Sequence, residues 1–352
     1  MCIRDRLGTA FPLFALIFLS KKFRKFYPNC RTLIEVIRLK YGKNLYKLIL
    51  LLSVFYMTIF LIAEVTAVAM LLNYISGTKL WITALIIISS SLIYTLYGGL
   101  RASIFTDNIQ FIILLILIIL AFSYLISFNQ DQFSFNYINK NNPSLLSINY
   151  IPNFTAGITF FIAVAATNLF HQGNWQRVYA AQNDKVLKNS LIFSSIIIIP
   201  IVFLMGYSGL VAISTNSNVV PDLAFFELLL KDQFFTISII VIFLSISLTV
   251  SSIDTIINAI SSLIIVDGVK IIKFNNSLLI SKQIIIIICL FAFLVASQGI
   301  SILYLFLIAD LLCCAGVMTV FYGFYNRNFS EKSAYLSIIF GLTIGLLSLI
   351  HI

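Results

Sequence analysis

The feature that most constrains this chain is its series of long apolar runs, which contain almost no charged residues. A helix of about 20 residues, rising about 1.5 Å per residue, crosses a hydrocarbon core of about 30 Å. Lipid offers no hydrogen-bond partners, so a backbone that crosses it must be helical or belong to a closed barrel. Barrel strands alternate apolar and polar residues, and these runs do not. The sequence therefore predicts an all-α fold, a polytopic membrane helix bundle.

The runs predict about ten transmembrane helices. They cover residues 7–20, 47–75, 80–98, 108–127, 153–172, 190–214, 233–266, 283–300, 301–325 and 335–352. The run 233–266 is too long for one straight crossing, so we expect it to tilt or to extend into water. Between the runs 283–300 and 301–325, we expect a tight turn at Gln298-Gly299.

Basic residues show how the helices are oriented. The gap 21–46 holds Lys21, Lys22, Arg24, Lys25, Arg31, Arg38, Lys40 and Lys43, and further basic residues follow in alternate gaps. The opposite gaps hold only Lys79, Lys140 and Lys231. An excess of lysine and arginine marks cytoplasmic loops, so the gap 21–46 is expected in the cytoplasm. The stretches 128–152 and 215–232 are then external loops, and Pro221-Asp222 opens a predicted short helix over 223–230.

Composition excludes several classes of protein. Hydrophobic residues make up 60% of the chain and charged residues only 10%, whereas soluble domains average about a quarter charged. The net charge of +10 comes from loops without an aromatic-basic module, so no nucleic-acid partner is expected. Phosphate loops, metal triads and nucleophile elbows do not occur in the sequence. We therefore expect neither an enzyme nor an ATP-driven pump, no cofactor, and a lipid bilayer as the surroundings.

Polar residues inside the run 233–266 form a stripe with helical spacing. They recur at steps of three and four, on one face of a helix: Ser247, Ser251, Asp254, Thr255, Asn258 and Ser262. Their oxygen atoms would suit a small hard cation. Close helix packing is the alternative, because small and hydroxyl residues also bring membrane helices together. The carboxylate of Asp254 favours an ion, because packing does not need it.

Other polar residues at membrane depth are candidates for function, because ionisable groups are costly there. Glu64 could contact a solute or couple to protons, or simply pair with a polar neighbour, and Asp310 resembles it. Asp107 begins the run 108–127, where it could do no more than complement the helix dipole.

The segment 165–177 is unusually polar for the end of a spanning helix. Either the helix is discontinuous here and exposes backbone groups, as in transporter sites, or it simply reaches the membrane surface. For Trp175 and Arg177 we favour the surface, with Trp175 in the interfacial belt and Arg177 in water. For Asn168, His171 and Gln172 the two interpretations stay open. A lone histidine here predicts no metal site.

Four segments together resemble the sodium/solute symporter family. The first, 32–42, is similar to its cytoplasmic T-x-x-E-x-x-x-x-R-Y-G segment, and 94–110 is similar to its most recognisable signature. Residues 175–181 resemble its Q-R-x-x-A-A segment, and 251–255 with Asp267 resemble its S-T-x-D-S helix. The segments occur in the family's order, and the resemblance covers residues 7–352.

The resemblance implies an inverted-repeat fold of five plus five helices, like that of the bacterial leucine transporter. It implies a principal sodium site made by the hydroxyls of Ser251 and Ser252 and the backbone carbonyl near Leu248. A second sodium site would use Asp107, Asp254 and Thr255. Its geometry is open, because the family has a hydroxyl residue where this chain has the Asp254 carboxylate. Solute would lie near mid-membrane, approached by Glu64 and by the segment holding Asn168, His171 and Gln172.

The same resemblance defines the expected domain. Residues 1–6 are interpreted as a non-native leader, and 7–352 as one transmembrane symporter domain without the family's first core helix and cut at its ends. We therefore expect transport by a longer parent protein.

The expected function is import of a small polar solute, such as an amino acid, urea, a sugar or a carboxylate, across the cell membrane with sodium. One alternative is the membrane sensor module of a histidine kinase. Another is proton coupling through Glu64 or Asp254.

Overall fold

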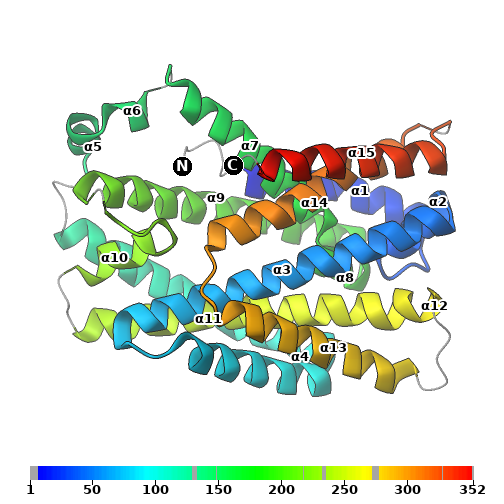
Figure 1. Cartoon of the computed structure of the whole chain (residues 1–352), viewed down its shortest axis with the longest axis horizontal. Helices are drawn as coiled ribbons and strands as arrows, with labels where there is room; N and C mark the ends of the chain where they lie inside the picture. The colour runs from blue at the N-terminus through cyan, green and yellow to red at the C-terminus, as the bar shows by residue number, and fades with distance from the viewer. Residues whose placement is uncertain are drawn as a thin grey trace.

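Long helices lie side by side in the computed structural model of the chain (Figure 1). The structure describes residues 7–128, 133–147, 149–216, 218–231, 235–271, 277–326 and 328–350. The predicted leader, residues 1–6, lies outside the described residues. Within them the chain forms helices and connecting turns, so the predicted all-α bundle is confirmed.

The long helices follow the apolar runs. They are α1 (Leu7–Phe26), α3 (Lys43–Ser76), α4 (Leu80–Phe128), α7 (Ile151–Phe170), α9 (Asp184–Thr215), α11 (Phe235–Ser262), α13 (Ser277–Ala296), α14 (Ile302–Tyr322) and α15 (Glu331–Ile350). Shorter helices join them: α2 (Leu33–Lys40), α5 (Phe135–Asn141), α6 (Pro143–Leu146), α8 (Gln172–Ala180), α10 (Ala224–Leu230) and α12 (Val269–Ile271).

The number of membrane spans is lower than predicted. Among the described residues, seven helices are long and apolar enough to cross a membrane, or eight if the bent pair Leu80–Ile93 and Thr95–Arg101 counts as one span. The predicted spans 7–20 and 335–352 fold as α1 and α15 but are not among the seven. For α1 the reason is charge, because Lys21, Lys22, Arg24 and Lys25 crowd its C-terminal end. The multi-pass arrangement itself is confirmed.

Two glycines end straight runs where the sequence predicts a change of direction. Gly99 has φ 57° and ψ −153°, which interrupts α4 between the predicted spans 80–98 and 108–127. Gly299 has φ 68° and separates α13 from α14 at the predicted turn. Residues with a side chain seldom adopt these positive φ values, so both breaks depend on glycine.

The long run 233–266 forms one of the longest continuous elements. After α11 the chain continues through a π-helical turn, η3 (Leu263–Gly268), into α12. The whole stretch Phe235–Ile271 has 37 residues, which at about 1.5 Å each is about 55 Å long, against a hydrocarbon core of about 30 Å. It is therefore too long for one straight crossing, and residues 251–255 lie near its middle.

The two ends of the bundle differ as the charge pattern predicts. In Figure 1, α5, α6 and α10 gather at one end, and α2 and α12 lie at the other. The first group comes from the predicted external stretches 128–152 and 215–232. The predicted short helix over 223–230 is confirmed as α10, preceded by a 3₁₀ turn, Pro221–Leu223.

At the opposite end α2 is attached to the end of the long helix. Thr32 caps α2 by accepting from the Glu35 amide (3.0 Å), and its hydroxyl donates to buried Asp267 Oδ2 (2.7 Å). Glu35 forms an ion pair with Lys270, and Tyr46 Oη donates to the Asp267 carbonyl (2.7 Å). The 32–42 segment and Asp267, two elements of the family resemblance, thus meet in one contact.

The apolar core has two parts. The larger surrounds α3 and combines side chains from α1, α2, α7, α8, α11, α13 and α14. The smaller joins α4, α5, α9, α10, the first half of α11 and Leu71 of α3. Because α3 and α11 contribute to both, they form the frame on which the polar site is built.

Candidate ion and solute site

The site begins with a helix break. Residue His171 has φ −61° and ψ 112°, which is extended, so α7 ends at Phe170 and α8 starts at Gln172. The last carbonyls of a helix have no partner within the helix. Here side chains supply donors: Asn174 Nδ2 to the Asn168 carbonyl (2.9 Å), Trp175 Nε1 to that of Leu169 (2.7 Å), and Tyr56 Oη to that of Phe170 (3.1 Å). The interpretation of 165–177 as a discontinuous helix is therefore confirmed.

His171 caps α8 at this break. Its Nδ1 accepts from the Gly173 amide (3.1 Å), so in the neutral ring the proton lies on Nε2. The glycine is required for the close approach, because a Cβ at Gly173 would lie 2.9 Å from both His171 and Thr255. The imidazole thus stands between α8 and α11 with one nitrogen already committed to the backbone.

A cavity of about 330 Å³ opens beside the break. Its lining includes predicted site residues from three segments, namely Glu64, Asn168, His171, Ser251, Ser252 and Thr255. The volume falls within the usual range of small-ligand sites, about 300–1,000 Å³. The structure therefore brings residues of α3, of α11 and of the helix break together around one cavity. Glu64 and Thr255 are almost 200 positions apart in the sequence.

Phe60, Thr167 and Ile256 also line the cavity and were not predicted. Phe60 lies one helical turn before Glu64, and Ile256 directly follows Thr255, so helical periodicity could have indicated both. Thr167 lies in the polar segment but was not singled out. Together these residues add an aromatic ring, an aliphatic wall and another hydroxyl to the site.

The three residues expected at the principal sodium site lie together on α11. Ser252 Oγ donates to the Leu248 carbonyl (3.2 Å), and Ser251 Oγ donates to Asp107 Oδ1 (2.7 Å). Both serines line the cavity. Hydroxyl and carbonyl oxygens are the ligands that hard cations prefer, so this donor set fits sodium as a transported ion.

The residues expected at a second sodium site hold a guanidinium instead. Arg177 Nη2 forms an ion pair with Asp107 Oδ2 (2.7 Å) and donates to Thr255 Oγ1 (3.2 Å). Arg177 thus pairs with Asp107 while its side chain stays 40% exposed, and Asp107 does more than complement a helix dipole. Desolvation explains the pairing, because a carboxylate among membrane helices requires a nearby positive charge. The sequence signal for this ion pair was that Arg177 is the basic residue of the polar segment 165–177.

Asp254 belongs to the same region but faces away from the cavity. Its side chain is fully buried and accepts from Ser103 Oγ (3.3 Å), Thr106 Oγ1 (3.3 Å) and Thr255 Oγ1 (3.4 Å). It therefore joins α11 to α4. The structure does not place it in the cavity lining with Ser251, Ser252 and Thr255.

A model of the sodium:solute symporter family matches residues 9–341. The chain belongs to this family. It is 26% identical over 349 residues to a spermidine transporter of Candida albicans, and the match covers 95% of this chain. The chain spans 65% of the length of that relative.

Among solved structures, the chain is similar to a Na⁺-coupled sialic acid symporter in a substrate-bound, outward-open state. The TM-score is 0.65 at 15% identity, covering 97% of this chain and 83% of the other. At this identity the likeness shows the shared fold, which is the leucine-transporter-like architecture expected from the sequence.

Two remaining candidate residues lie behind the cavity. Gln172 is buried; its Oε1 accepts from the Leu33 amide (3.4 Å) and its Nε2 donates to Ser262 Oγ (3.4 Å). It links α8 to α2 and α11 and does not line the cavity. Asp310 of α14 accepts from Thr167 Oγ1 (2.5 Å), so it reaches the cavity only through that threonine.

The position of Trp175 in the segment 165–177 differs from the predicted one. Its side chain is 0% exposed and stacks on Phe23 of α1, with ring centroids 5.1 Å apart, and on Phe321 of α14, 6.3 Å apart. The prediction of an interfacial position is wrong. The helix break turns α8 back into the bundle, where aromatic rings from α1 and α14 enclose the indole.

Replacing Trp175 by Phe should destabilise the protein. The ring can still stack, but the Leu169 carbonyl loses its donor, which should lower the free energy of unfolding by about 1–3 kcal/mol. Thermal unfolding in detergent measures the effect. The chain's other tryptophan, Trp81, is 49% exposed and provides the control, because Trp81→Phe should change stability by less than about 0.5 kcal/mol. Equal stability losses in both variants would contradict the role given to the indole donor.

Proposed function

We propose that the protein imports a small solute carrying a protonated amine, driven by sodium and using alternating access. The observation that supports this most directly is the cavity beside the helix break. It combines hydroxyl oxygens for an ion, from Ser251 and Ser252, with one carboxylate for a cation, from Glu64. Broken helices at mid-membrane are where transporters of this architecture bind ions and solutes.

The energy available from sodium is sufficient for such import. One charge moving through about 100 mV yields about 2.3 kcal/mol. A tenfold sodium gradient adds about 1.4 kcal/mol. A single ion per cycle could therefore support a solute accumulation of roughly a few hundredfold.

The proposed ion ligands are the Leu248 carbonyl and the hydroxyls of Ser251 and Ser252. Support comes from their position at the middle of the long helix and from the cavity that both serines line. Their hydroxyls donate to the Asp107 carboxylate and to the Leu248 carbonyl. A hydroxyl that donates its hydrogen keeps two acceptor lone pairs, so both serines could bind a cation without breaking these bonds.

Substituting Ser252 by Ala in the full protein should raise the sodium concentration for half-maximal uptake by roughly tenfold, the effect of losing about 1.4 kcal/mol of binding. Solute uptake is measured over a sodium series in proteoliposomes. Ser245→Ala is the matched control, because Ser245 is a buried serine of the same helix that bonds only to the Ile242 carbonyl in the described contacts and does not line the cavity. An unchanged sodium dependence in the Ser252 variant rules this hydroxyl out as a ligand.

A second transported ion is not needed in this proposal. The Arg177 guanidinium already bonds to Asp107 and Thr255, two of the residues that would otherwise hold that ion. Asp254, the third, is occupied with hydroxyl donors from α4. We therefore assign one sodium ion to each cycle, with Arg177 as the fixed positive charge of the second position.

The ratio of sodium flux to solute flux in proteoliposomes tests this assignment. Wild-type protein and Asp254→Asn should show the same sodium stoichiometry, with one ion per solute. Arg177→Gln removes the fixed charge beside Asp107, so sodium should take its place and the Hill coefficient for sodium should rise from about one towards two, the number of ions then bound. A stoichiometry that changes in Asp254→Asn, or two ions per cycle in the wild type, would show that Asp254 and its neighbours hold an ion.

The solute class is inferred from charge. Glu64 is the acidic residue of the cavity lining, which contains no lysine or arginine. A carboxylate favours an ammonium group, and the Phe60 ring next to it can also attract a cation. The similar Candida albicans protein is a spermidine transporter, which supports an amine. Solutes whose only charge is a carboxylate would find no partner of opposite sign in this lining.

A solute panel assayed with and without sodium gradients tests this inference. Amines should be taken up best, and Glu64→Gln should reduce their uptake at low concentration by roughly tenfold or more, since hydrogen bonds to charged groups contribute about 1.5–3 kcal/mol. A neutral solute such as urea, if it is taken up, should lose less. Uptake restricted to carboxylates, or driven by a proton gradient without sodium, would overturn the proposal.

A further inference from the structure

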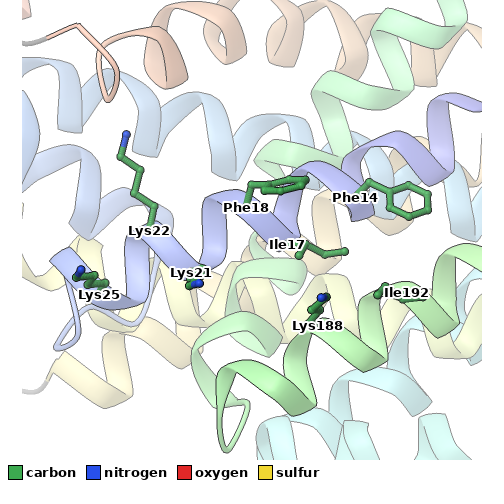
Figure 2. A pocket seen from close by; sticks show the side chains of 8 residues that line it. All are labelled: Phe14, Ile17, Phe18, Lys21, Lys22, Lys25, Lys188 and Ile192. Atoms are coloured by element: carbon green, nitrogen blue, oxygen red, sulfur yellow. The ribbon is translucent and has the colours of Figure 1, made fainter.

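A basic and apolar groove lies between α1 and α9, apart from the cavity of the proposed transport site. It has a volume of about 600 Å³. Its lining combines apolar side chains, among them Phe14, Ile17 and Ile192, with lysines from both helices. Figure 2 shows Lys21 of α1 and Lys188 of α9 between the two helices, with Phe14 and Ile192 farther along them. Nothing in the proposed transport cycle uses this groove.

Both helices change from apolar to basic in the same direction. On α1, Phe14, Phe18, Lys21 and Lys25 follow each other at steps of three and four, which places them on one face. From Phe14 to Lys25 the helix rises about 16 Å, close to half of a hydrocarbon core of about 30 Å. On α9, which packs against α1, Lys188 likewise precedes Ile192 by one turn. The groove therefore has the depth and the polarity gradient of a single lipid leaflet.

The positive charges of three groove lysines are available to a ligand. Within the described part of the chain, Lys21, Lys25 and Lys188 take part in no ion pair with a carboxylate. Asp184 is the acidic residue nearby, and its carboxylate already pairs with Arg24 (3.3 Å). A smaller hollow of about 250 Å³ adjoins the groove, and its lining combines Lys21, Lys185 and Lys188 with Asp184. This hollow lies where a headgroup would sit.

Lys22 differs from these lysines. Its Nζ donates to the Phe324 carbonyl (3.1 Å) and lies 3.8 Å from the centre of the Tyr325 ring. In Figure 2 its side chain extends to the opposite side of α1 from Lys188. Lys22 therefore connects α1 to the residues that follow α14. The positive charge of the groove comes from the other lysines.

We propose that this groove binds an anionic phospholipid, with its phosphate held by Lys21, Lys25 and Lys188 and an acyl chain along Phe14, Phe18 and Ile192. Charge complementarity selects the lipid. Basic hollows between helices at the predicted cytoplasmic side attract anionic headgroups, and the apolar half of the groove excludes a soluble anion as its main occupant. Phe18, which is 74% exposed, would be covered by the chain of the lipid.

A second groove provides a matched comparison. It lies between α3 and α15, has a volume of about 710 Å³, and is lined by Lys47 and Lys332 together with Glu331. The Glu331 carboxylate accepts from the amides of Asn44 (2.7 Å) and Leu45 (3.1 Å). Its presence reduces the positive charge, so this groove should not retain an anionic lipid selectively.

The test uses the full protein, stripped of lipid and titrated with phosphatidylglycerol or phosphatidylcholine in detergent, with native mass spectrometry as the readout. Wild-type protein should retain phosphatidylglycerol preferentially. Lys21→Gln/Lys188→Gln should weaken this retention roughly tenfold to thirtyfold, given the contribution of each lysine near a headgroup. Lys21→Arg/Lys188→Arg should keep it, and so should Lys47→Gln/Lys332→Gln. Equal retention in all variants, or an equal loss in the control pair, overturns the proposal.

A photo-crosslinking amino acid in place of Phe18 tests the occupant directly. In membranes containing both lipids, crosslinks should form to lipid, and phosphatidylglycerol should predominate among the products. Crosslinks to protein would mean that another segment or subunit covers the groove, which also overturns the proposal. Neither measurement depends on transport, so failure of the lipid site and failure of the proposed symport are distinguishable.

Discussion

The break at His171 is the constraint on which the rest of the site depends. A helix that stops inside a membrane leaves carbonyl groups that water cannot reach, and each unsatisfied group costs free energy. Asn174, Trp175 and Tyr56 supply the missing donors. Because Tyr56 comes from α3, and the Trp175 ring packs on α1 and α14, the break is held by the surrounding bundle. The cavity lies beside this break, where the backbone carbonyls already have hydrogen-bond donors.

Charge compensation is the second condition. Asp107 of α4 lies beside α11 and Asp254 belongs to α11, and a carboxylate within the bundle must be paired or hydrogen-bonded. Arg177 forms an ion pair with Asp107, and the hydroxyls of Ser103 and Thr106 donate hydrogen bonds to Asp254. These contacts bring the 94–110, 175–181 and 251–255 segments together. The segments that resemble the family are therefore one polar structure in space, which connects α4, α8 and α11 around the proposed ion position.

At the predicted cytoplasmic end, helices are bonded to one another and lysines give the surface a positive charge. There α2 is joined to the end of α11 through Thr32 and Asp267 and through the pair of Glu35 with Lys270. Gln172 adds a bond from α8 to the first turn of α2. Movement of α2 or α8 during alternating access would have to exchange these bonds together. The lysines of the groove between α1 and α9 lie at the same end, where an anionic lipid would contact an element adjacent to this attachment.

The sequence by itself determined the helical class, most of the long helices, the opposite character of the two ends and the family, because hydropathy, loop charge and local motifs are written in consecutive residues. It also indicated Ser251, Thr255, Glu64, Asn168 and His171, since polar groups at membrane depth are rare, and it indicated Ser252 through the family resemblance. Only the tertiary structure decided which neighbour each of them meets. Consecutive helical residues point about 100° apart, so Asp254 faces α4 while Ser251 and Thr255 face the cavity. Trp175 was misplaced because its partners, Phe23 and Phe321, lie far away in the chain, and the ion pair of Arg177 with Asp107 was missed for the same reason.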